Sequence, residues 1–147
     1  MIKDLFSIEI NASPSVVWQA IWSKETFTEW ASLFCPEQRA ESDWQPGSKA
    51  FFLNDENTGV IYNVENCIPN ELMSLKQIGM VISGVEDYDS DKVKEIIGLT
   101  EDIVLKPTEH GTMLTMEIEI YPRVREMALP MFPKSLEKIK EIAERIK

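Results

Sequence analysis

The C-terminal segment of this chain repeats apolar residues at the spacing of an α-helix. The apolar positions are Phe132, Leu136, Ile139, Ala143 and Ile146, and Lys134, Lys138, Lys140 and Glu141 occupy others. Pro130 and Pro133 should start or kink this helix, because an interior proline removes a hydrogen bond and clashes with the preceding turn. A long helix with one apolar face must bury that face, so the rest of the chain has to supply a partner surface.

Most of the preceding chain alternates apolar and polar residues, as half-buried strands do. Strands are predicted over residues 2–10, on both sides of the Pro46-Gly47 turn, and over 60–65, 72–78, 99–106 and 112–121. Short turns such as "NDENTG", "IPNE" and "PTEHG" separate them. The pattern is typical of an antiparallel meander of about six strands, so we predict an antiparallel sheet with its helices on one face.

Residues 13–30, "SPSVVWQAIWSKETFTEW", contain three of the four tryptophans. Ser13 is a good N-cap, and Pro14 suits the first helical position, where its missing N–H costs nothing. A second helical piece follows and ends at Pro36. We predict two short helices whose tryptophans mostly pack onto the sheet, with one of them reaching a pocket.

Residues 79–97, "GMVISGVEDYDSDKVKEII", interrupt the alternation. Two glycines and an acidic run favour a loop, in which "SDKVKEII" forms one helical turn or two. The stretch "DYDSDK" has aspartates at alternate positions but lacks the glycine and glutamate of a calcium-binding loop. We interpret the segment as a solvated acidic loop, which is either a rigid insertion or a mobile lid.

Length, charge and cysteine content limit the classes of protein that remain. The 147 residues fit a single domain over 1–147. A net charge of −10 disfavours nucleic acid and membrane surfaces as partners, and no apolar run approaches the roughly 20 residues of a membrane span. Cys35 and Cys67 are too few for a disulfide framework or a metal site and should be reduced. The N-terminus lacks a signal peptide's apolar region, so we expect a cytoplasmic protein. The sequence has no phosphate-binding loop and no zinc motif, and we expect neither a cofactor nor a metal.

Several stretches resemble one known superfamily. "INASPSVVWQAIWSKETFTEW" resembles its first strand and helix pair, "WQPGSKAFF" its turn into the third strand, "VENCIPNELMSLK" its next strand pair, and "GTMLTMEIEI" with "PKSLEKIKEIAERIK" its closing strand and long helix. This is the START-like or SRPBCC superfamily, typified by the birch-pollen allergen. "GVEDYDSDKVKEIIGLTEDIVL" is similar to a linker in the branch labelled activator of heat-shock-protein 90 ATPase homologue. The resemblance implies an α+β helix-grip fold, in which a curved antiparallel sheet of six or seven strands wraps around a long C-terminal helix.

In this superfamily a cavity lies between the sheet and the long helix, which implies a ligand site there. The lining expected for this chain is Ile8, Trp30, Phe34, Tyr62, Val64, Ile103, Met116, Ile118, Met127, Met131, Phe132 and Leu136. The three near the start of the last helix, Met127, Met131 and Phe132, either border the cavity mouth or belong to an ordinary core. On an inward face the Tyr62 hydroxyl would need a partner, which a ligand could supply.

The sequence offers few groups for catalysis. His110 is the only histidine and lies in a predicted hairpin turn, so no Ser-His-Asp or Cys-His arrangement is expected. Glu101 shares strand parity with Leu99, Ile103 and Leu105, and a carboxyl in an apolar cavity would have a raised pKa and could act as a general acid or base. Alternatively, the strand end twists and Glu101 meets solvent or a lysine, which is the interpretation we favour.

Three functional hypotheses follow. The leading one is a non-enzymatic carrier or sensor that holds a small apolar or amphipathic molecule between the sheet and the C-terminal helix. The second is a co-chaperone-like interaction module that binds a protein client through an exposed apolar patch. The third is an enzyme similar to the cyclases and hydratases of the superfamily, polyketide cyclases among them, with Glu101 as acid or base. We expect a monomer or a weak homodimer.

Overall fold

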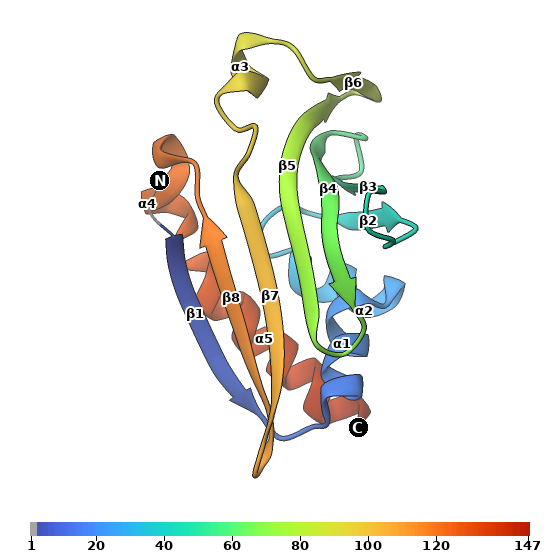
Figure 1. Ribbon diagram of the computed structural model, residues 1–147, viewed down its shortest axis with the longest axis vertical. Helices are drawn as coiled ribbons and strands as arrows, with labels where there is room; N and C mark the ends of the chain where they lie inside the picture. The colour runs from blue at the N-terminus through green and yellow to red at the C-terminus, as the bar shows by residue number, and fades with distance from the viewer. Residues whose placement is uncertain (1–2) are drawn as a thin grey trace.

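One curved antiparallel sheet organises the computed structural model, which describes residues 3–147 (Figure 1). Its strands are β1 (Lys3–Ile10), β2 (Arg39–Ser42), β3 (Lys49–Leu53), β4 (Gly59–Ile68), β5 (Leu72–Ile82), β6 (Val85–Asp87), β7 (Thr100–Thr108) and β8 (Gly111–Glu119). The helices are α1 (Pro14–Trp22), α2 (Lys24–Ala31), α3 (Asp91–Lys94), the 3-10 helix η1 (Pro122–Val124), α4 (Arg125–Ala128) and α5 (Met131–Ile146). No helix within residues 3–147 is long and apolar enough to cross a membrane.

The sheet runs in the order β1-β8-β7-β5-β4-β3-β2, and β6 pairs with β5 outside that path. All pairs are antiparallel, so the predicted α+β helix-grip class is confirmed. The sheet has eight strands rather than six or seven, because the predicted acidic loop itself contains structure. Strand β5 continues to Ile82, β6 follows, and α3 supplies the predicted helical turn with the Ser90 side chain as its N-cap.

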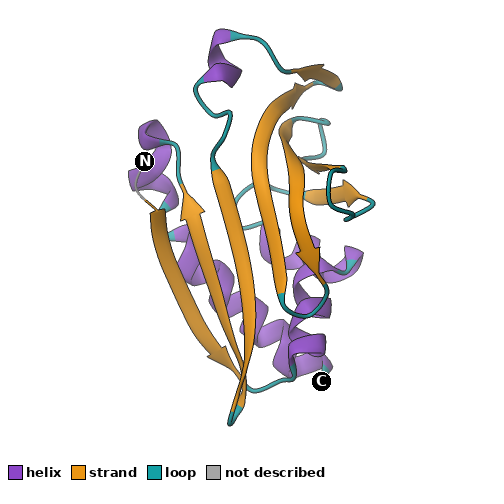
Figure 2. Cartoon of the chain, viewed as in Figure 1, coloured by secondary structure: helices purple, strands orange, loops and turns teal. Residues whose placement is uncertain are grey.

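The helix α5 lies across the sheet on the same side as α1 and α2, as Figure 2 shows. It begins at Met131 and continues through Pro133, which falls in the first turn, where a missing N–H leaves no hydrogen bond unmade. Its buried face consists of Ser135, Leu136, Ile139, Ile142 and Ala143. The four apolar residues among them join the inward sides of the strands in the main core, so burial of this apolar stripe holds sheet and helix together.

The tryptophans of α1 and α2 mainly pack this core. Trp30 is 6% exposed, and its Nε1 donates to the Ile21 carbonyl at 2.9 Å, which fixes the angle between the two helices. Trp22 packs against Trp44 from the loop before β3, with ring centroids 4.9 Å apart. Among the three tryptophans of residues 13–30, only Trp30 also lines the cavity described below.

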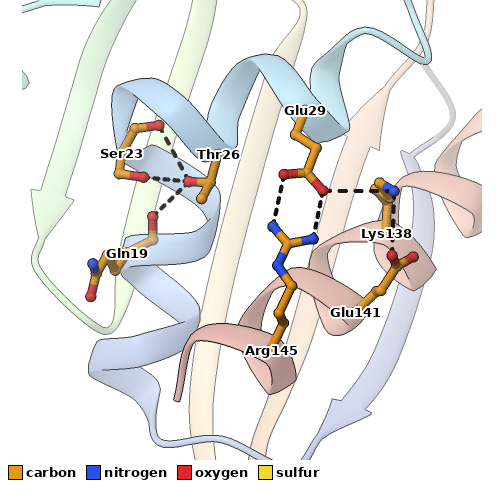
Figure 3. Close-up of polar contacts among 7 residues, drawn as sticks. All are labelled: Gln19, Ser23, Thr26, Glu29, Lys138, Glu141 and Arg145. Carbon is orange, nitrogen blue, oxygen red and sulfur yellow. Dashed lines mark hydrogen bonds and ion pairs between the residues drawn. The ribbon is translucent and has the colours of Figure 1, made fainter.

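An ion-pair cluster joins α2 to α5 on the surface (Figure 3). The Arg145 guanidinium donates to both Glu29 carboxylate oxygens, at 2.8 and 3.1 Å, and Lys138 Nζ lies 3.7 Å from the same carboxylate. The hydrogen bond from Arg145 lowers the pKa of Glu29 despite some desolvation. At the α1–α2 junction, the Thr26 hydroxyl donates to the Gln19 carbonyl at 3.0 Å. These contacts fix the helix pair against α5.

Replacing Glu29 with glutamine is expected to lower the free energy of unfolding by less than about 1 kcal/mol, because the pairs are partly exposed. The Glu29 pKa is lowered in the folded state, so the loss is present above its ordinary pKa of 4.5 and fades as the pH falls below it. Urea titrations of wild type and variant at low and at about 1 M salt check this, since salt screens exposed pairs. Glu137→Gln, an exposed change on α5, is the matched control; an equal loss there would contradict the prediction.

Candidate functional site

A cavity of about 480 Å³ lies between the sheet and the helices, at the end where α3 and η1 lie (uppermost in Figure 1). Its volume falls in the range of about 300–1,000 Å³ that small-molecule sites occupy. The lining residues are Phe27, Trp30, Phe34, Gln38, Phe52, Val60, Tyr62, Gln77, Met80, Lys92, Glu95, Ile96, Glu101, Ile118, Glu119, Ile120, Tyr121, Arg123, Val124 and Phe132. The lining is therefore mostly apolar, with a few polar groups among aromatic and aliphatic side chains.

Aromatic rings from four elements form much of the wall. Phe52 of β3 lies between Phe27 of α2 and Tyr62 of β4, with ring centroids 5.2 and 4.8 Å away. Phe34 follows α2 and packs on Phe132 of α5 at 5.1 Å. Since neighbouring rings at these separations hold one another in place, the wall is preformed.

Glu101 is the acidic side chain of the inner cavity. It lies on β7 opposite Leu75 of β5 and Ile118 of β8, and strand alternation turns it inward together with Ile103 and Leu105. Burial raises the pKa of Glu101 from 4.5 to about 7; a hydrogen-bonding interaction with Tyr62 lowers it, and the neighbouring Asp102 charge raises it. The residue is half-buried, and the surface that it keeps lines the cavity. The exposed position that we favoured from sequence is therefore wrong.

Tyr62 and Gln77 lie beside this carboxyl. They face each other across β4 and β5, and both line the cavity. Burial raises the pKa of Tyr62 well above 10, the charge of Glu101 raises it further, and Gln77 opposes the shift through hydrogen bonding. The phenol therefore stays neutral near pH 7 and can donate or accept a hydrogen bond.

A β-bulge interrupts the pairing of β4 with β5 next to Tyr62 and Gln77. Ile61 pairs with Gly79 and Tyr62 with Gln77, which leaves Ile78 without a partner on β4. The extra residue shifts the alternation of β5, so that Gln77 and Met80 both line the cavity. Ile78 instead packs with a small second cluster of Leu53, Ile61 and Val81.

Two segments meet at the cavity mouth. Lys92, Glu95 and Ile96 come from α3 and the residues after it, and Tyr121, Arg123 and Val124 come from η1 and its approach. The Tyr121 hydroxyl donates to Glu95, and Arg123 Nη2 lies 4.0 Å from the same carboxylate. The α4 side is held to β1 by Arg125, which donates to both Asp4 oxygens at 2.6 and 3.1 Å. Glu95 thus links the predicted acidic loop to η1; motion of that loop as a lid stays a prediction.

The structure brings together part of the lining predicted from sequence. Trp30, Phe34, Tyr62, Ile118 and Phe132 line the cavity. Val64, Ile103, Met116 and Leu136 are buried in the packed core, and Ile8 and Met131 are partly buried outside the lining. Met127 is 67% exposed on α4, because that single turn presents it to solvent. The predicted and observed linings differ because buried side chains fill the space between the sheet and α5 away from α3 and η1. The cavity is therefore confined to the end of the sheet near α3 and η1.

Sequence reasoning missed several lining residues. Phe52 and Val60 carry the inward parity of their strands and could have been found from it. Gln77 has the same parity as the buried Met73 and Leu75, whereas Met80 depends on the bulge, and no sequence signal marks Gln38. His110 is exposed in the β7–β8 turn, as predicted, and both cysteines are free thiols. Within residues 3–147 no group of three His, Cys, Asp or Glu side chains is placed to hold a metal ion.

Comparison with known proteins places the chain in a family. The profile described as Activator of Hsp90 ATPase homolog 1-like protein matches residues 11–144. The chain belongs to this family. No curated protein sequence matches it significantly.

Solved structures show the same fold. A protein from Mesorhizobium loti aligns with a TM-score of 0.76 at 18% identity, over 99% of both chains. A solution structure described as the Aha1 dimer from Colwellia psychrerythraea aligns with a TM-score of 0.73 at 16% identity, over 98% of this chain and 97% of that one. At these identities the similarity establishes the family fold, and the function has to be argued from the site.

Proposed function

We propose that this member of the family is a carrier or sensor that binds a small, mainly apolar molecule in the cavity between the sheet and the helices. The observation that carries the proposal is the cavity itself, about 480 Å³ in volume and walled by preformed aromatic rings. Burial of apolar ligand surface supplies affinity there, and the few polar groups supply orientation. Native mass spectrometry of the freshly purified protein, followed by solvent extraction, tests the proposal directly. A ligand released on unfolding supports it.

Filling the cavity with a larger side chain should weaken this binding. Val60 lines the cavity, and Val60→Trp should lower the affinity for N-phenyl-1-naphthylamine, an uncharged fluorescent probe, by at least about 10-fold, because the indole would occupy the space the probe needs. Probe titration by fluorescence measures the change. Val85→Trp is the matched control, since Val85 is 68% exposed at the β5–β6 turn. Equal affinities of Val60→Trp and wild type, with native circular dichroism in both, would contradict cavity binding.

Acid–base catalysis on a bound molecule is a second candidate, which the position of Glu101 favours. A carboxyl whose pKa is about 7 can give and take a proton near neutrality. The test is turnover of cyclisation or hydration substrates by wild type and Glu101→Gln. Activity that survives this substitution would exclude Glu101 as the acid or base.

We expect the protein to act in the cytoplasm as a monomer or weak homodimer, without nucleic acid. The net charge of −10 supports the exclusion of polyanionic partners, and the Colwellia relative is described as a dimer. The co-chaperone-like role is supported only by the family description, so it stays a prediction for this chain. Light scattering over a range of concentrations measures the oligomeric state.

A further inference from the structure

The charges that line the cavity are unevenly distributed. Three carboxylates belong to the lining, those of Glu95, Glu101 and Glu119, and two cations do, Lys92 and Arg123. Both cations lie at the mouth on exposed residues, and Arg123 lies beside Glu95. The inner, aromatic part contains Glu101 and no cationic side chain among the lining residues. A ligand that enters fully therefore meets a carboxyl and neutral polar groups.

We propose that the ligand of this cavity is an apolar molecule, aromatic or aliphatic, that carries one basic nitrogen, and that its ammonium group pairs with the Glu101 carboxylate. This inference rests on the proposed binding function and names the class of ligand. Tyr62 and Gln77, which flank Glu101, would accept the remaining ammonium hydrogens through their hydroxyl and amide oxygens.

The placement of Glu101 supports a cation over other ligands. A carboxylate inside an apolar cavity is costly unless an opposite charge or hydrogen-bond donors accompany it, and the neighbouring groups that the structure supplies are Tyr62 and Gln77. An ammonium group provides the missing charge. A carboxylate or phosphate ligand would instead approach Glu101 with a like charge, while the cations remain at the mouth.

The aromatic wall favours the same class. Tyr62 packs against Phe52, which packs against Phe27, and all three rings line the same cavity as Glu101. Ring faces attract cations, and the attraction grows when water is excluded. The same rings accept the apolar body of the molecule, so one wall serves both parts of an amphipathic amine.

Three naphthalene probes that differ only in their polar group test the inference: 2-naphthylmethylamine, 2-naphthylmethanol and 2-naphthoic acid. Calorimetry at about pH 8 should show the amine binding at least about 10-fold more tightly than the alcohol, as a charge-assisted hydrogen bond allows. Glu101→Gln should remove that advantage and change the affinity for the alcohol by less than about 3-fold, because the side chain keeps its size.

The amine should also bind more tightly as Glu101 loses its proton. Its affinity should rise between about pH 6 and about pH 8 in the wild type and stay flat in Glu101→Gln. The titratable group beside Glu101 is Tyr62 from β4, and Asp102 is its neighbour along β7 with its side chain on the opposite face of the sheet. The other charged groups of the lining are Lys92, Glu95, Glu119 and Arg123. Near neutrality Tyr62 stays neutral and the pKa of Glu119 is lowered by Thr100, so neither accounts for a rise near pH 7.

Glu109→Gln is the matched control, because Glu109 is an exposed carboxylate in the β7–β8 turn and does not line the cavity. It should change amine affinity by less than about 3-fold. Equal binding of amine and alcohol to the wild type, or equal losses in both variants, would overturn the amine inference and leave cavity binding intact. Failure of all three probes to bind, with N-phenyl-1-naphthylamine also unbound, would overturn the cavity function as well.

Discussion

Replacing Gly111 with alanine is expected to destabilise the fold by at least about 3 kcal/mol. Gly111 opens β8 with φ +151°, and a Cβ atom there would lie 2.2 Å from the Ile10 carbonyl oxygen and 2.8 Å from the Ala12 nitrogen. These atoms have little freedom to move, because the Ala12 N–H donates to the Ile10 carbonyl and the buried Thr112 hydroxyl donates to the Ala12 carbonyl. The substitution would force apart the end of β1, the start of α1 and the β7–β8 hairpin.

Gly84→Ala separates this close approach from the conformational cost of replacing any glycine. Gly84 has φ +82° in the β5–β6 turn, and nothing lies within 4 Å of a Cβ placed there. It should lose only about 1 kcal/mol, the cost of placing a side chain in that backbone region. Urea unfolding of both variants gives the comparison. Equal losses would show that contact with the β1–α1 junction contributes nothing, contrary to our expectation.

The fold could be predicted from sequence wherever local and long-range requirements agree. Ser13 caps α1, as its position before Pro14 predicts, and Ser90 caps α3, each accepting the backbone N–H three residues later. The apolar stripe of α5 and the inward residues of the strands then require each other, since neither can bury its apolar face alone. These features depend on the spacing of apolar residues and on helix-capping residues, and both can be recognised from the sequence.

The candidate site was less predictable because it depends on interruptions of those periods. The bulge at Ile78 reverses the alternation of β5 after Gln77 and brings Met80 into the lining, and no residue type marks the bulge in advance. The periodicity of a strand or helix predicts which residues point inward, but it does not predict whether their side chains fill the space between the sheet and α5. Met116 and Leu136 therefore belong to the packed core, although the sequence predicts them in the cavity lining. Strand parity correctly predicts that Glu101 points inward. The expectation that its carboxyl would avoid the cavity is wrong, because a buried acid can remain there at a cost in folding free energy.

The cost of an ionised Glu101 carboxyl in the cavity leads to a second large effect. Glu101→Gln should stabilise the ligand-free protein at alkaline pH. Below its ordinary pKa of 4.5, Glu101 is protonated in both the folded and the unfolded state, so wild type and variant should be nearly equal in stability. Between 4.5 and about 7 the unfolded chain ionises while the folded protein holds its proton, and the wild type loses stability as the pH rises. Above about 7 the loss levels off at about 3 kcal/mol, at about 1.4 kcal/mol per tenfold change in proton affinity. Glutamine, which stays neutral, avoids this loss.

Urea titrations of both proteins at about pH 4, about pH 6 and about pH 8 measure the difference, and Glu119→Gln supplies the opposite sign. Hydrogen bonds from Thr100 lower the pKa of Glu119, so its ionised form stabilises the fold above its ordinary pKa, and this variant should be less stable than wild type at about pH 8. A Glu101→Gln variant no more stable than wild type at that pH would mean that the carboxyl is well solvated. If the gain is found, an amine ligand should reduce it, because the ammonium group compensates the charge that the empty cavity leaves unpaired.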